Sequence, residues 1–169
     1  MSRVAIQALI ITTAALLQTA VFPHLAIAGF RPDLLLLVTA AFGLREGAPS
    51  GLRVGFAAGL VADLLVNQTA VGLQALVFLA VGYTVGVARP YLAPESLSAP
   101  LVVAFVSGLV GTSGYGLLSR LLGDAAFTGQ RVVQAAIFVA LYNTLLAPIV
   151  VNAIGQFGER FPAERSAAI

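Results

Sequence analysis

Three glycines and an aspartate recur at every fourth position, at Gly51, Gly55, Gly59 and Asp63. Residues at this spacing share one face of a helix, and a row of small residues lets two helix backbones approach closely in lipid. A carboxylate at the centre of an inserted helix costs about 2.5 to 3.5 kcal/mol, so it needs a partner or a function. The stripe therefore predicts both a helix-packing face and a polar site.

A second acid and two further side chains are candidates for the same polar site. Asp33 is expected at the start of one helix and Asp63 one turn before the end of the next, so both face the outer half of the membrane. Gln74 begins the following helix at similar depth, and Tyr83 lies far enough inside that helix to form hydrogen bonds. With Pro32, which precedes Asp33, these residues predict an outward-opening pocket or a partner-binding site.

Alternatives to a binding site remain open. Asp63 paired with Arg31, Arg120 or Arg131 would fix the helix packing without binding anything, and this interpretation is favoured over a ligand or partner contact. A proton relay is the weakest alternative, because it needs a chain of acids or histidines through the membrane. The single histidine, His24, lies in an expected loop.

A second stripe of small residues occurs later in the chain, at Gly108, Thr112 and Gly116. It predicts a second face where helices pack closely. For the first stripe, packing against neighbouring helices of the same chain is favoured over contact with another protein, although the same physical principle allows both.

The composition is that of an integral membrane protein. Of the 169 residues, 59% are hydrophobic and 9% are charged, and the mean hydropathy is +0.98. Long neutral runs without strand-like alternation favour helices over a barrel. There is no cysteine, which excludes disulfides, cysteine-ligated metals and thiol catalysis, and the arginines are too scattered to bind nucleic acid.

We expect an all-α, six-helix transmembrane bundle that forms a single domain over residues 1–169. The helices are expected at 4–22, 33–44, 51–66, 71–88, 101–119 and 132–157. The neutral part of the second helix spans about 16 Å, too short to cross lipid alone, so it is short or is extended through charged ends. Alternatively, the second and third helices form a hairpin that re-enters from outside. A cleaved secretory signal over residues 1–28 is disfavoured because its apolar run is too long.

Six spans place both termini on one side of the membrane. The arginines on that side would be Arg3, Arg45, Arg53, Arg89, Arg160 and Arg165. Those on the other side would be Arg31, Arg120 and Arg131. Because cytoplasmic loops carry the excess of positive charge, the termini are expected in the cytoplasm.

Enzyme signatures are missing from the sequence. A nucleophile elbow, a group of histidines and carboxylates at metal-binding spacing, and a phosphate-binding glycine loop are all absent. We therefore expect no catalysis, no metal and no cofactor. An intramembrane aspartyl pair formed by Asp33 and Asp63 stays as the one enzymatic alternative.

Residues 30–90 carry an ordered set of motifs that resembles one known family. Arg31-Pro32-Asp33 opens a leucine-rich helix, and a basic turn follows it. A glycine-spaced helix then ends in Asp63, and Gly72-Leu73 precedes a helix that contains Gly82-Tyr83. In this order and spacing the chain resembles the MreD family of rod shape-determining membrane proteins.

The resemblance implies a non-enzymatic component of the cell-elongation machinery in the bacterial inner membrane. It implies binding to MreC, a bitopic protein with a periplasmic domain. Through MreC it implies a link to the cytoskeletal protein MreB and to the glycosyltransferase and transpeptidase that make peptidoglycan. It also implies a fold similar to the substrate-binding components of energy-coupling-factor transporters. The rival hypothesis is therefore a vitamin- or metabolite-binding transporter component that uses the polar pocket.

Overall fold

The computed structural model describes residues 3–22, 26, 29–65, 71–92, 96, 98–124 and 128–160, and the side chains of these residues as far as 156. His24 and Arg165 lie outside the described residues.

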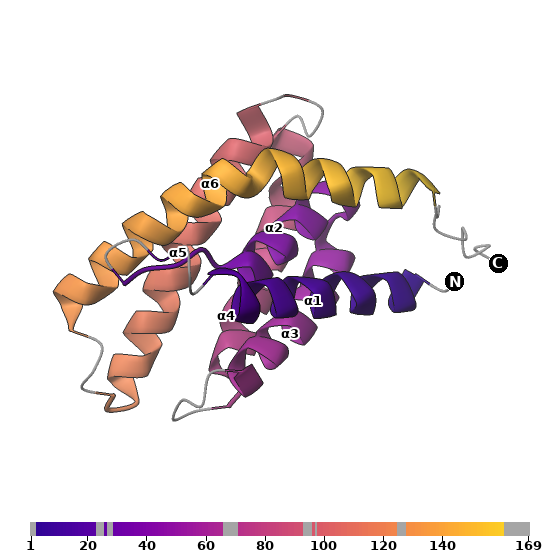
Figure 1. Ribbon diagram of the computed structural model, residues 1–169. Coiled ribbons are helices and arrows are strands. Elements are labelled where there is room, and N and C mark those ends of the chain that lie inside the picture. Colours follow the sequence, from indigo (N-terminus) through magenta and orange to yellow (C-terminus); the bar gives the residue numbers. More distant parts are fainter. Residues whose placement is uncertain are drawn as a thin grey trace.

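The described residues form six α-helices, as predicted. They are α1 (Arg3–Ala20), α2 (Leu34–Glu46), α3 (Ala48–Leu65), α4 (Leu73–Ala88), α5 (Ser98–Leu121) and α6 (Gly129–Arg160), with a short 3₁₀ helix η2 (Arg89–Tyr91) after α4. Five of them, all except α2, are long and apolar enough to cross a membrane. The start of α1 and the end of α6 lie at the same end of the bundle (Figure 1). This end is called the termini end below, and the opposite one the outer end.

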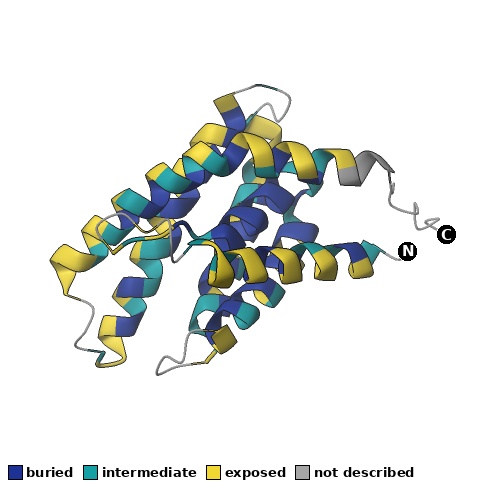
Figure 2. Cartoon of the chain, viewed as in Figure 1, coloured by how far each residue is buried: buried dark blue, intermediate teal, exposed yellow. Residues whose placement is uncertain are grey.

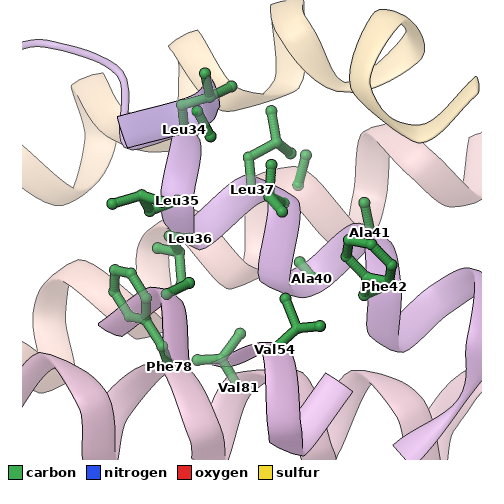
Figure 3. Close-up of a cluster of buried hydrophobic side chains, with 14 of the residues drawn as sticks. Leu34, Leu35, Leu36, Leu37, Ala40, Ala41, Phe42, Val54, Phe78 and Val81 are labelled. Carbon is green, nitrogen blue, oxygen red and sulfur yellow. The ribbon is translucent and has the colours of Figure 1, made fainter. Parts of the chain in front are cut away.

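The helix α2 forms the centre of the bundle. Every residue from Leu34 to Leu44 is buried, and α2 packs against all five other helices. Leu36 and Ala40 of α2 lie close to Val54 of α3 and to Phe78 and Val81 of α4 (Figure 3). A helix that is shielded on every side does not meet lipid, so its 13 residues suffice although they are too few for an ordinary span.

The connection between α2 and α3 lies at the termini end. Gly47 forms it with φ of 92°, a value that favours glycine because a side chain would strain the backbone. Arg3 of α1 forms an ion pair with Glu46 at 3.3 Å, and Gln7 donates a hydrogen bond to Ser50 at 3.1 Å. The connection therefore lies beside the first turns of α1, which agrees with two crossing helices rather than a re-entrant hairpin.

The exposed sides of the helices, which run around the bundle between its two ends, are apolar. Leu16, Val110 and Leu145 are 62%, 57% and 76% exposed, and exposed residues follow one another along α1 and α6 (Figure 2). A soluble protein rarely exposes so continuous an apolar surface. This distribution is the one that lipid requires.

Glycines bring α3 and α4 into backbone contact. A Cβ atom added to Gly55 would lie 2.5 Å from the carbonyl oxygen of Phe78, and one added to Gly51 or Gly59 would collide with the backbone of Gly82 or Ala75. The first small-residue stripe thus packs inside the chain. The matching stripe on α4, which contains Gly82, was not singled out from the sequence.

The second stripe has a divided role. A Cβ on Gly108 would lie 2.7 Å from Cα of Ala140, so α5 and α6 touch there. At Gly116 the neighbour is instead the side chain of Val132. Thr112, which was expected to pack between helices, lines the polar pocket described next.

Candidate functional site

A polar pocket of about 200 Å³ lies in the outer half of the bundle, where the segment before α2 meets α1, α4, α5 and α6. We call it the outer pocket. Polar and apolar side chains share its wall. The lining residues are Gln18, Arg31, Pro32, Asp33, Gln74, Phe78, Gly111, Thr112, Tyr115 and Val139.

The segment that carries Asp33 is held by side chains from two other helices. Asn143 of α6, which is fully buried, accepts a hydrogen bond from the N–H of Asp33 and donates one to its carbonyl oxygen, both at 3.1 Å. Gln18 of α1 accepts a hydrogen bond from the N–H of Leu35 at 3.0 Å. Sequence reasoning missed both residues, although a lone Asn within an apolar span is a signal of an interhelical hydrogen bond.

Asp33 itself caps α2. Its carboxylate accepts a hydrogen bond from the N–H of Leu36 at 3.1 Å, which satisfies one of the free donors at the start of the helix. Its side chain also lines the outer pocket together with Pro32 and Gln74. Three of the five residues expected in the polar site are therefore brought together.

Within the described residues, Asp63 neither lines the outer pocket nor pairs with an arginine. Its Oδ2 accepts hydrogen bonds from the N–H groups of Gly72 at 2.9 Å and Ala75 at 3.1 Å, and its Oδ1 accepts one from the N–H of Gln74 at 3.1 Å. These are N–H groups at the start of α4, where the helix dipole also favours a negative charge. The sequence pointed to an ion pair, but the carboxylate caps the next helix instead.

The two aspartates therefore have separate structural roles. Both oxygens of Asp63 already accept backbone hydrogen bonds, whereas Asp33 lies in the pocket wall. They do not share a pocket in which one substrate would contact both. Among the described residues, no three His, Cys, Asp or Glu side chains are placed to hold a metal ion.

Tyr83 lies away from the outer pocket. It is 50% exposed on α4 and is not among the pocket's lining residues. Arg120 and Arg131, which were candidate partners of Asp63, are exposed and do not line it either.

A second hollow, which the sequence did not predict, runs between α4 and α5. We call it the α4–α5 groove. Its volume is about 530 Å³, and its wall is almost wholly apolar. The residues of α5 that line it run from Val102 to Leu118, which corresponds to about 24 Å at 1.5 Å per residue. The groove therefore covers most of the roughly 30 Å of hydrocarbon in a bilayer.

Comparison with known proteins settles the family. The family model described as rod shape-determining protein MreD matches residues 2–156. The chain belongs to the MreD family. The match takes in α1 to α5 and most of α6, whereas the motifs recognised in the sequence occupy residues 30–90. No curated protein and no solved structure that was compared with the chain matches it.

Membership in the MreD family makes the chain a multi-pass, rod shape-determining membrane protein. The expected similarity to transporter substrate-binding components stays a prediction. The polar residues of the outer pocket and the apolar wall of the α4–α5 groove are two features that could bind something outside the chain.

Proposed function

We propose that this MreD-family protein is a non-enzymatic scaffold of the rod-shape machinery, and that it binds the transmembrane helix of a bitopic, MreC-like partner in the α4–α5 groove. The observation that carries the proposal is the length of the groove. A hollow that runs about 24 Å along α5 is long enough to reach into both leaflets, and a helix fills such a hollow continuously.

The chemistry of the groove supports a helix as its occupant. Transmembrane helices associate through close van der Waals contact, and small residues at the interface let the backbones approach. Ala80, Ser107 and Gly114 provide such small positions along the wall. Larger side chains such as Val106, which is 49% exposed, provide contact area around them.

The two glycine stripes do not supply this interface, because α4 covers the stripe of α3 and α6 covers Gly108. A partner therefore has to bind a face made of other residues. At about 530 Å³ the groove is larger than the outer pocket, at about 200 Å³. Through the partner, the scaffold would connect to MreB and to the glycosyltransferase and transpeptidase of peptidoglycan synthesis.

The orientation that we propose places both termini in the cytoplasm of a bacterial cell, with the chain in the inner membrane. Arg3, Arg45, Arg53 and Arg89 lie at or near the termini end, and the family's role in rod shape agrees with this membrane. The outer pocket then opens toward the periplasmic side.

Cysteine cross-linking tests the proposed interface directly, because the chain has no cysteine of its own. Thr84→Cys and Val106→Cys, one from each wall of the groove, are each paired with single cysteines scanned along the partner's transmembrane helix. Leu145→Cys, which is 76% exposed on α6, is the matched control. We expect cross-links from both groove positions that recur with a helical period along the partner.

The results separate the scaffold role from the location of the interface. Cross-links from Leu145→Cys alone would place the partner elsewhere and reject the groove. A full-length partner that fails to co-purify with the wild-type chain from native membranes would reject the scaffold itself.

A second candidate function, binding of a small polar metabolite, is favoured only by the polar lining of the outer pocket. Since Asp63 is outside that pocket, Thr112→Phe is the more informative substitution. A ligand found by mass spectrometry in the wild type and lost in Thr112→Phe, with the fold retained, would support this function.

A further inference from the structure

A third hollow, distinct from the α4–α5 groove and the outer pocket, lies between α1 and α6. Within the described residues these two helices do not pack against one another, and the face of α2 between them forms the floor. We call it the α1–α6 groove. Its volume is about 260 Å³ and its wall is apolar, with Leu9 and Leu17 of α1, Val38 of α2, and Ile149 and Ile154 of α6 among its lining residues.

The length of the α1–α6 groove differs from that of the α4–α5 groove. Its lining residues on α1 run from Leu9 to Leu17, or about 12 Å at 1.5 Å per residue. One leaflet of a bilayer contributes about half of the roughly 30 Å of hydrocarbon. The groove therefore matches the depth of a single leaflet, which suits a lipid acyl chain rather than a spanning helix.

A cationic side chain lies beyond the termini end of this groove. Arg45 is seven residues after Val38 on α2, so the two share one helix face and Arg45 lies about 10 Å closer to the termini end. Its guanidinium lies over Gly155 of α6 and donates a long hydrogen bond of 3.5 Å to Asn152. Arg45 does not line the groove, but its guanidinium lies at Gly155, next to the lining residue Ile154. Apolar walls are thus followed by a positive charge toward the termini end, which is the order of the acyl chains and the headgroup in a phospholipid.

Within the part of the chain that the structure describes, the hydrogen-bonding capacity of Arg45 is largely unused. A guanidinium has five N–H donors, and the buried Nε of Arg45 has no partner among the described residues. An unpartnered buried donor is costly, and a phosphate oxygen is the acceptor that a guanidinium binds best, often with two parallel hydrogen bonds. Arg3, one helix away, is already paired with Glu46, so of these two arginines Arg45 is the better placed to bind an anion.

We infer that the α1–α6 groove and Arg45 together form a binding site for an anionic phospholipid of the leaflet at the termini end. One acyl chain lies along α2 between α1 and α6, and the headgroup phosphate binds the Arg45 guanidinium. A headgroup with net negative charge is preferred over a zwitterionic one, because a headgroup cation would lie close to Arg45 and Arg3. This inference is independent of the partner-binding role of the α4–α5 groove.

Native mass spectrometry of the full chain in detergent tests the site. The purified protein is mixed with dioleoylphosphatidylglycerol or with dioleoylphosphatidylcholine, and the lipid-bound fraction is compared. We expect phosphatidylglycerol to be retained over phosphatidylcholine by the wild type. Arg45→Gln should lower phosphatidylglycerol binding by about tenfold or more, since hydrogen bonds to charged groups have at least that effect on affinity.

Two further variants separate headgroup from chain. Ala153→Trp, which fills the α1–α6 groove at an exposed lining position, should weaken both lipids and leave the preference between them unchanged. Val106→Trp, which fills the α4–α5 groove instead, is the control and should leave binding of both lipids as in the wild type. Arg45→Lys keeps the charge and should keep part of the preference, which guards against a folding defect in Arg45→Gln.

Several results would overturn the inference. Equal retention of phosphatidylglycerol by the wild type, Arg45→Gln and Arg45→Lys would show that Arg45 does not bind the headgroup. Lipid loss in Val106→Trp that equals the loss in Ala153→Trp would show that the bound lipid is not in the α1–α6 groove. Circular dichroism on each variant verifies that the helices are retained.

Discussion

Replacing Asp63 with asparagine should destabilise the fold rather than abolish binding of a ligand. The carboxylate accepts three hydrogen bonds from the start of α4, two at Oδ2 and one at Oδ1. Asparagine has one acceptor oxygen. If that oxygen takes the place of Oδ2, the side-chain NH₂ group faces the N–H of Gln74, and that donor is left without a partner.

The expected cost follows from these contacts. A buried, unpaired donor costs about 1 to 3 kcal/mol. Loss of a negative charge at a helix N-terminus adds about 0.3 to 1 kcal/mol at an exposed site and up to about 2 when partly buried, and Asp63 is 8% exposed. We therefore expect Asp63→Asn to lower the free energy of unfolding by about 2 to 4 kcal/mol. Asp63→Ala, which removes all three acceptor contacts, should exceed about 4 kcal/mol.

The measurement is an unfolding titration in mixed micelles followed by circular dichroism, combined with hydrogen exchange at the first turn of α4. Asp33→Asn is the comparator, because Asp33 accepts one backbone N–H and should cost only about 1 kcal/mol. Faster exchange at Gln74 and Ala75 in Asp63→Asn is the specific signature of a lost cap. An Asp63→Asn protein within about 0.5 kcal/mol of the wild type, or less affected than Asp33→Asn, would refute the reasoning.

Three other outcomes are expected. Gly55→Ala should separate α3 from α4 and cost more than about 2 kcal/mol in an unfolding titration, whereas Gly114→Ala, whose nearest neighbour would be 3.9 Å away, should be tolerated. Asn143→Leu should cost about 2 to 5 kcal/mol by the same assay, because both backbone groups of Asp33 lose their partner. For topology, Val71→Cys should react with a membrane-impermeant maleimide in spheroplasts, and Tyr91→Cys only in broken cells; the reverse pattern would invert the proposed orientation.

The helices themselves follow from the hydrophobic runs, and glycine spacing correctly indicated that α3 packs closely on a neighbour. Identifying that neighbour as α4 required the structure, because the opposing Gly82 matters only once the two helices are in register. The burial of α2 could be partly anticipated, since a helix too short to face lipid has to be shielded by protein.

Asp63 shows why the polar contacts were harder to predict. In the sequence the visible partners of a carboxylate are arginines, while backbone N–H groups are the same at every position and carry no signal. The free N–H groups at the start of α4 can donate hydrogen bonds to the Asp63 carboxylate only once α4 packs beside α3. The expectation that groups within the chain would satisfy the Asp63 charge was correct. The expectation that an arginine would do so was wrong, because backbone N–H groups of Gly72, Gln74 and Ala75 do.

The grooves are invisible in the sequence for a different reason. In a membrane protein the side chains that meet lipid and those that meet a partner helix are equally apolar, so composition does not separate them. The two grooves differ in length. At 1.5 Å per residue, the α4–α5 groove extends about 24 Å along α5 and the α1–α6 groove about 12 Å along α1. Because the glycine stripes are covered inside the chain, these two grooves are the surfaces on which a helix and a lipid can bind the bundle at the same time. A partner that binds in the longer groove should therefore leave lipid binding at Arg45 intact.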